Sequence, residues 1–210
     1  ANPKAKYPVL YLLHGAGGDE EAWISMGRTA EILDNLIAQG KACPMLVVMT
    51  NGNAWQQAAP GEAADGMGQP AMRMAGNRPT ASFEESFGDV INFVESNYRV
   101  IKKKEGRAVA GLSMGGGGST SYAQRHADMF CACYAMSALM HLPAPAEAAP
   151  KNEKDKMWHL TKSVNKLSCV DFVKNADDKT KEALRTVAWY VDCGDDDFLF
   201  ECNMDFIAAM

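Results

Sequence analysis

The sequence predicts an α/β protein in which helices lie on both faces of a mostly parallel central sheet. Five short apolar runs indicate buried strands, because their apolar residues are nearly continuous rather than alternating. Segments with helical periodicity separate these runs, and this alternation is typical of a doubly wound parallel sheet. The predicted strands are residues 7–13, 44–50, 108–112, 130–137 and 187–193.

Four segments carry a helical pattern. The clearest is 82–98, where Ser82 and Glu85 form a capping box and apolar residues then recur at the helical period. Residues 29–39 place isoleucine and leucine side chains along one helical face. We expect the other two helices to begin near residues 114 and 198.

Two stretches interrupt the alternation of strands and helices. Residues 51–81 are rich in glycine, alanine, proline and methionine, and a loop of about thirty residues inside a domain is usually functional or disordered. Residues 139–163 combine prolines with a charged run. This second stretch is equally compatible with an insertion over the sheet and with a solvated excursion.

The composition excludes several classes of partner. The 210 residues include 21 basic and 26 acidic side chains, for a net charge of −5, which offers no general attraction to nucleic acid or anionic lipid. No apolar run approaches the ~18 residues that span a bilayer. We therefore expect neither nucleic acid nor a membrane as a partner. The six cysteines form no CxxC pair, so we expect no zinc site. Their even number permits disulfides, but buried free thiols are the default expectation. We expect no metal and no cofactor.

The strongest chemical signal is the GxSxG motif Gly111-Leu112-Ser113-Met114-Gly115. It follows a predicted strand and precedes a predicted helix. A sharp strand-to-helix turn lifts the serine hydroxyl to the top of the sheet, and the glycines remove side chains that would block the turn. Ser113 is therefore the candidate nucleophile. The N–H of Met114, at the helix N-terminus, can bind a developing oxyanion. The glycines continue to Gly118, which predicts very close packing of this helix.

A second glycine-rich motif, His14-Gly15-Ala16-Gly17-Gly18, follows the first predicted strand directly. A loop after an early strand supplies the other oxyanion N–H in hydrolases built on a GxSxG turn. Ala16 is the expected donor, and Gly15 is expected to approach the substrate. We expect His14 to be structural and to hydrogen-bond the loop, because backbone rather than an imidazole makes the oxyanion hole.

Three consecutive aspartates, Asp195, Asp196 and Asp197, follow the last predicted strand. In a serine hydrolase of this kind the acid lies on a loop after a late strand, where it orients the catalytic histidine. The residues alone do not choose among the three. They leave open an N-cap for the last helix and, less strongly, a calcium site without EF-hand spacing.

Several segments together resemble the esterase-D and feruloyl-esterase group, carbohydrate esterase family one of the α/β-hydrolase superfamily. They are YPVLYLLHGAGGDEEAW, LDNLIAQGK, PMLVVMTNG, GLSMGGG and CGDDDFLFECN. The resemblance runs over nearly the whole chain. It implies an α/β-hydrolase fold, with Ser113 as nucleophile, Asp197 as acid, and Ala16 and Met114 as oxyanion donors. It also matches Trp23 to an aromatic residue near the acyl site.

The resemblance implies a serine carboxylesterase that acts on feruloyl or acetyl esters of plant xylan, an ester-bearing polysaccharide or oligosaccharide. Two alternatives stay open, an S-formylglutathione-type thioesterase and a non-catalytic hydrolase-fold protein that binds carbohydrate. Trp55 is a candidate substrate contact in the long loop, with a plain surface role equally compatible. Relatives of this kind are usually exported, so we expect a secreted or periplasmic protein, although the cytoplasm is not excluded. The sequence leaves a homodimer open.

One feature departs from the family pattern. The family's catalytic histidine follows the acid in the chain, whereas His126, His141 and His159 all precede Asp197. None of the three is a good candidate for the base. We therefore expect residues 1–210 to form one α/β-hydrolase domain that lacks the first strands and the C-terminal histidine segment of the family.

Overall fold

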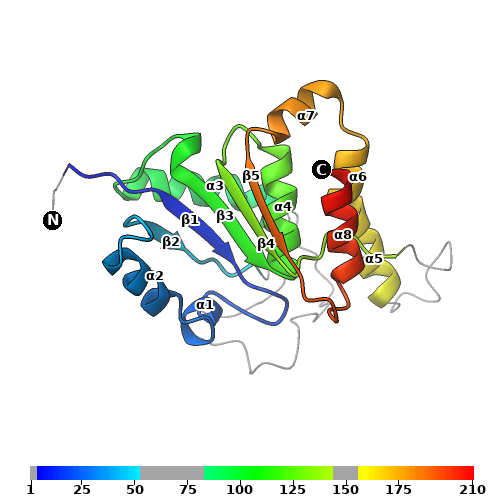
Figure 1. The fold of residues 1–210 in the computed structure, drawn as a ribbon, viewed down its shortest axis with the longest axis horizontal. Coiled ribbons are helices and arrows are strands. Elements are labelled where there is room, and N and C mark those ends of the chain that lie inside the picture. The colour runs from blue at the N-terminus through cyan, green and yellow to red at the C-terminus, as the bar shows by residue number, and fades with distance from the viewer. Residues whose placement is uncertain (1–3, 53–82, 144–155) are drawn as a thin grey trace.

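Five parallel strands form the central sheet of the computed structural model, which describes residues 4–52, 83–143 and 156–210 (Figure 1). The strand order is β2-β1-β3-β4-β5, so β1 and β3 lie side by side although a long stretch of chain separates them. The strands are β1 Val9–Leu13, β2 Leu46–Val48, β3 Arg107–Leu112, β4 Ala132–Met136 and β5 Ala188–Asp192. All five predicted strands are confirmed, each within its predicted range or one residue outside it.

Helices connect and flank these strands. They are α1 Ala22–Ser25, α2 Thr29–Ala38, α3 Phe83–Asn97, α4 Met114–Arg125, α5 Lys156–Lys166, α6 Cys169–Lys174, α7 Asp178–Leu184 and α8 Phe200–Ala209, with a short 3₁₀ turn η1 at Lys104–Gly106. The four predicted helices correspond to α2, α3, α4 and α8. The sequence analysis missed α1, α6 and α7, and α5 begins inside the stretch 139–163. The capping box of Ser82 lies outside the described residues.

An aromatic cluster packs α3 and α4 against one face of the sheet. Tyr11 of β1 meets Phe87 of α3 edge-to-face, with ring centroids 5.4 Å apart. Phe87 meets Tyr122 of α4 in the same way at 4.6 Å, and Phe130 completes the cluster. Such pairs add about 0.5–1.5 kcal/mol beyond the area they bury. This face therefore anchors both helices firmly.

The opposite face of the sheet is partly exposed to solvent at β4 and β5. Tyr134 is 39% exposed and Tyr190 is 61% exposed, and their rings meet edge-to-face on the sheet surface. The near-continuous apolar pattern of these strands predicted burial on both sides. The side chains of Trp189 and Val191, which alternate with Tyr190, pack into the second core cluster.

All six cysteines are free. Cys133, Cys169 and Cys202 are buried, as expected, whereas Cys43 is exposed. Burial raises the pKa of the Cys133 thiol to about 12, so this sulfur stays protonated and unreactive. Within the described residues no helix is long and apolar enough to cross a membrane.

The glycine run packs α4 against backbone, as predicted. A Cβ on Gly116 would lie 2.7 Å from Cβ of Ala138, and one on Gly117 would overlap the carbonyl oxygen of Leu139. Both neighbours belong to the chain that follows β4. Only glycine at these positions lets the helix approach that segment so closely.

This packing predicts opposite effects for two glycine-to-alanine changes in helices. Gly117→Ala should lower the free energy of unfolding by roughly 1–3 kcal/mol, because the new methyl group meets backbone that cannot retreat. Gly88→Ala in α3 should raise it by roughly 0.5–1 kcal/mol, since the nearest atom to its Cβ is the Tyr122 hydroxyl oxygen at 3.7 Å. Urea denaturation of both variants checks this, and equal effects would contradict it.

Candidate active site

Ser113 occupies the sharp turn between β3 and α4 that the GxSxG motif predicts. Its backbone has φ 54° and ψ −113°, a conformation that residues with a side chain rarely adopt and that costs roughly 1–3 kcal/mol. The N–H of Ser113 donates to the carbonyl of Met136, and its own carbonyl accepts from Gly117 and Leu139. These bonds hold the turn against strands β3 and β4.

Glycines at both ends of the motif make this turn possible. A Cβ on Gly111 would lie 2.8 Å from the backbone nitrogen of Gly116. A Cβ on Gly115 would lie 2.6 Å from the carbonyl oxygen of Leu13, at the end of β1. The start of α4 therefore rests on the backbone of the strand that leads into the other glycine-rich motif.

The loop after β1 lies against the serine. A Cβ placed on Gly15 would be 3.5 Å from Cβ of Ser113 and 3.4 Å from the carbonyl oxygen of Leu112. Ser113 is half-buried and Ala16 is exposed. Within the described part of the chain, the N–H groups of Ala16 and Met114 have no hydrogen-bond acceptor. The loop that carries Ala16 therefore lies against the turn through Gly15, and the amide hydrogens of Ala16 and Met114 are available.

Asp197 differs from its two neighbours in the aspartate run. Asp195 and Asp196 are exposed, whereas Asp197 is half-buried and accepts a hydrogen bond from the N–H of Leu199 at 2.8 Å. The N-cap of α8 is Leu199. The prediction that one of the three aspartates is the N-cap residue is therefore wrong. Among the described residues no three His, Cys, Asp or Glu side chains gather to hold a metal ion.

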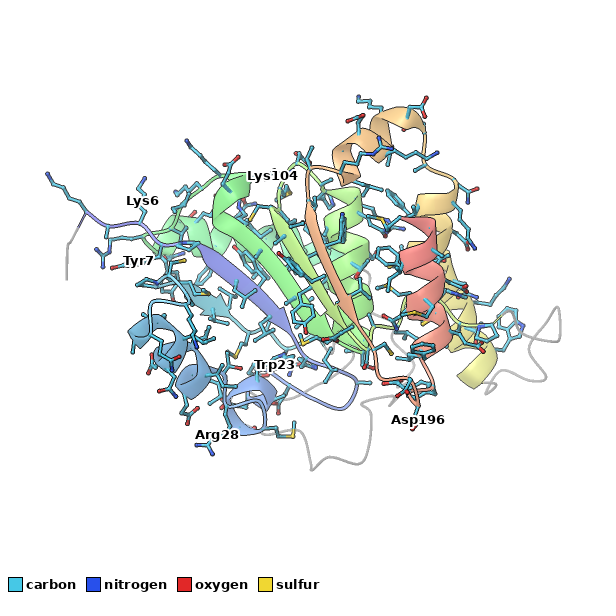
Figure 2. The ribbon with its side chains drawn as sticks, in the orientation of Figure 1. Lys6, Tyr7, Trp23, Arg28, Lys104 and Asp196 are labelled. Carbon is cyan, nitrogen blue, oxygen red and sulfur yellow. The ribbon has the colours of Figure 1, made fainter. Side chains whose placement is uncertain are left out.

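Ser113 and the aspartate loop lie at the same edge of the sheet. Ser113 donates to Met136 at the end of β4, and Ser137 donates to Asp192 at the end of β5, at 2.9 and 2.8 Å. Two strand spacings, roughly 10 Å, therefore separate the turn from the chain that leads to Asp197. Figure 2 shows Asp196 at this edge.

The described histidines have other partners. His14 bonds two backbone groups near the turn, as the structural interpretation predicted. His126 ends α4, where its ring contacts that of Tyr122 at a tilt, roughly 20 Å along the helix from Ser113. His141 pairs with Asp205 of α8 at 3.0 Å. The side chain of His159 lies outside the described residues.

The predicted aromatic contacts have different outcomes. Trp23 lies in α1, and Figure 2 shows it at the same edge of the sheet as Asp196. Its Nε1 is buried and has no hydrogen-bond partner among the described residues. A role for Trp23 at the acyl group stays a prediction. Trp55 lies outside the described residues.

Sequence reasoning missed the chain that follows β4. The carbonyl of Met136 and the N–H of Leu139 bond the backbone of Ser113 directly, and Ser137 has a positive φ of 39°. These groups act through backbone atoms, so no residue type marks them in the sequence. The same holds for Gly52, whose N–H reaches His14 from the loop after β2.

Comparisons with known proteins agree with this geometry. The family model described as "Putative esterase" matches residues 1–206. A solved structure described as "ferulic acid esterase" superposes with a TM-score of 0.80 at 43% identity, over 100% of this chain and 74% of that one. An S-formylglutathione hydrolase from Staphylococcus aureus has a TM-score of 0.64 at 21% identity, over 97% of this chain and 70% of that one, which shows a shared fold.

Among curated proteins, an "Endo-1,4-beta-xylanase/feruloyl esterase" of Xylanibacter ruminicola is 35% identical over 128 residues. The match covers 60% of this chain but only 16% of that protein. The chain therefore spans about a sixth of the length of this relative.

The strained turn predicts that Ser113 is held at a cost to stability. Ser113→Gly should be more stable than Ser113→Ala by roughly 1 kcal/mol, because glycine accepts the positive φ that alanine does not. Both variants lack the hydroxyl, so the difference isolates the backbone. Urea denaturation of the pair measures it, and an alanine variant as stable as the glycine variant would show an unstrained turn.

Proposed function

This chain belongs to the esterase family, and on that basis we propose that it is a serine carboxylesterase that removes feruloyl or acetyl groups from plant xylan. The observation that carries the proposal is the strained Ser113 turn packed against Gly15. A fold gains no stability from such a turn, so its presence supports catalysis over carbohydrate binding alone.

The mechanism follows from the positions of these groups. The Ser113 oxygen attacks the ester carbonyl carbon while a histidine base takes the hydroxyl proton. The carbonyl oxygen becomes an oxyanion that the N–H groups of Ala16 and Met114 stabilise. The intermediate then expels the sugar alcohol, which receives the proton. Water, activated by the same histidine, releases the acid from the acyl-enzyme and restores Ser113.

Asp197 is the proposed acid that orients the histidine. Its bond to the N–H of Leu199 fixes the carboxylate, and its partial burial sets it apart from the exposed Asp195 and Asp196. The base is not His14, His126 or His141, because each of these is held elsewhere. Among the histidines whose side chains the structure describes, none is the proposed base.

Apolar side chains beside the predicted catalytic residues support an aromatic acyl group. Leu112, directly before Ser113, is 41% exposed, and Phe198, directly after Asp197, is 87% exposed. A feruloyl ring offers apolar surface that such side chains can cover. A polymeric xylan does not cross a membrane unaided, which supports a secreted or periplasmic location. The similarity to ferulic acid esterase supports the same substrate class.

The first experiment measures hydrolysis of methyl ferulate and p-nitrophenyl acetate by the chain and by Ser113→Ala. With a histidine base in place, the substitution should lower kcat by roughly 10⁶-fold, since it removes the nucleophile; in a polypeptide without that base, both rates should lie close to the same residual level. S-formylglutathione serves as the competing substrate. A faster rate on the thioester would favour the thioesterase alternative, and a chain no more active than Ser113→Ala would contradict the esterase assignment for this polypeptide.

The second experiment compares two neighbouring aspartates. Asp197→Asn should lower kcat by roughly 10⁴-fold, because an amide cannot hold the histidine in its working tautomer. Asp196→Asn is the matched control and should leave kcat unchanged, since Asp196 is exposed. Similar losses in both variants, or none in either, would remove Asp197 from the proposed mechanism.

A further inference from the structure

We propose that His14 is a positioning residue that fixes the orientation of the oxyanion-hole N–H of Ala16. This inference rests on the proposed esterase function and adds to it a residue that acts through the backbone. His14 is only 3% exposed, and both of its ring nitrogens are hydrogen-bonded to backbone groups of two different loops.

The two hydrogen bonds fix the tautomer of the ring. The N–H of Gly52 lies 2.9 Å from Nε2, and a backbone N–H can only donate, so Nε2 carries no proton and accepts. Nδ1 lies 2.8 Å from the carbonyl oxygen of Gly15, which can only accept, so Nδ1 carries the proton. His14 is therefore a neutral imidazole with one defined donor and one defined acceptor.

The donor side of the ring controls one peptide unit. The Gly15 carbonyl accepts from His14 Nδ1 and, at 3.1 Å, from the N–H of Gly18. The peptide bond from Gly15 to Ala16 is trans and planar, so its C=O and N–H point in opposite directions. Fixing the Gly15 carbonyl toward the ring therefore fixes the Ala16 N–H away from it. This peptide unit begins at Gly15, which packs on Ser113.

Two glycines, Gly18 and Gly52, lie next to the His14 ring. A Cβ on Gly18 would lie 3.2 Å from both Cβ and Nδ1 of His14, and a Cβ on Gly52 would lie 3.6 Å from Nε2. Glycine at these positions leaves space for the imidazole between the loops after β1 and β2, where its two hydrogen bonds hold it. The oxyanion donor is oriented before a substrate arrives, and such preorganisation is what makes hydrogen bonds to a transition state effective.

The test separates the donor from the acceptor with two amide variants. In His14→Asn the side-chain NH₂ lies near the position of Nδ1 and can still donate to the Gly15 carbonyl. In His14→Gln the side-chain oxygen lies near the position of Nε2 and can still accept from Gly52. His14→Ala removes both bonds. We expect kcat on methyl ferulate to fall roughly 10- to 100-fold in the Gln and Ala variants with KM nearly unchanged, and to be largely retained in the Asn variant.

The unfolding temperatures of the three variants are measured alongside kcat. If His14 had only a structural role, the loss of kcat would follow the loss of stability. Equal kcat losses in the Asn and Gln variants, or losses that track the unfolding temperature, would overturn the proposal. An unvaried chain no faster than Ser113→Ala would instead count against the proposed function.

A second measurement does not depend on turnover. In ¹⁵N-labelled protein the two ring nitrogens of His14 are distinguished by NMR, and their signals are assigned by their loss in His14→Asn. A protonated Nδ1 with an unprotonated Nε2 supports the proposal. A protonated Nε2, or a ring that exchanges between tautomers, would overturn it even if the chain hydrolysed no ester.

Discussion

The contact on which the rest of the site depends is between backbone and backbone, where the first turn of α4 meets the end of β1. Gly115 lies against the carbonyl groups of Leu13 and His14. Atoms of the main chain cannot turn aside as a side chain can, so this contact limits the position of the helix start. That position brings Ser113 against Gly15 and sets the geometry on which the proposed chemistry relies.

Hydrogen bonds from the chain after β4 balance the strain at the turn. Met136 and Leu139 bond the backbone of Ser113, and each such bond contributes about 1 kcal/mol. Asn203 of α8, which is fully buried, then ties this segment to the last helix through both the N–H and the C=O of Ala138. The same helix follows the Asp197 loop. The nucleophile turn and the aspartate loop are therefore held by one connected set of bonds.

The packing of the sheet differs on its two sides, and the Ser113 turn lies where α4 contacts the strands directly. The aromatic cluster around Tyr11 and Phe87 fixes α3 and α4 on one face. Over β4 and β5 the opposite face keeps Tyr134 and Tyr190 exposed. The edge that carries Ser113 belongs to β1, β3 and β4, the strands that α4 contacts directly. A well-packed helix is what allows a strained turn to persist at its start.

Apolar periodicity and glycine spacing are local properties of the chain, so the strands, the longest helices and the sharp turn at Ser113 could be predicted from the sequence. It also placed Ala16 and Met114 at turns after strands. The residues alone left three aspartates equivalent and the family resemblance pointed to Asp197, which the fold sets apart by its partial burial and its bond to Leu199. The short helices α6 and α7 went unpredicted, since six or seven residues hold too little periodicity to recognise. The bond from Gly52 to His14 joins residues 38 positions apart, and the partners of the Ser113 backbone are carbonyl and amide groups that every residue possesses. Such contacts arise only when the sheet brings strand ends together, so the tertiary structure alone could decide them.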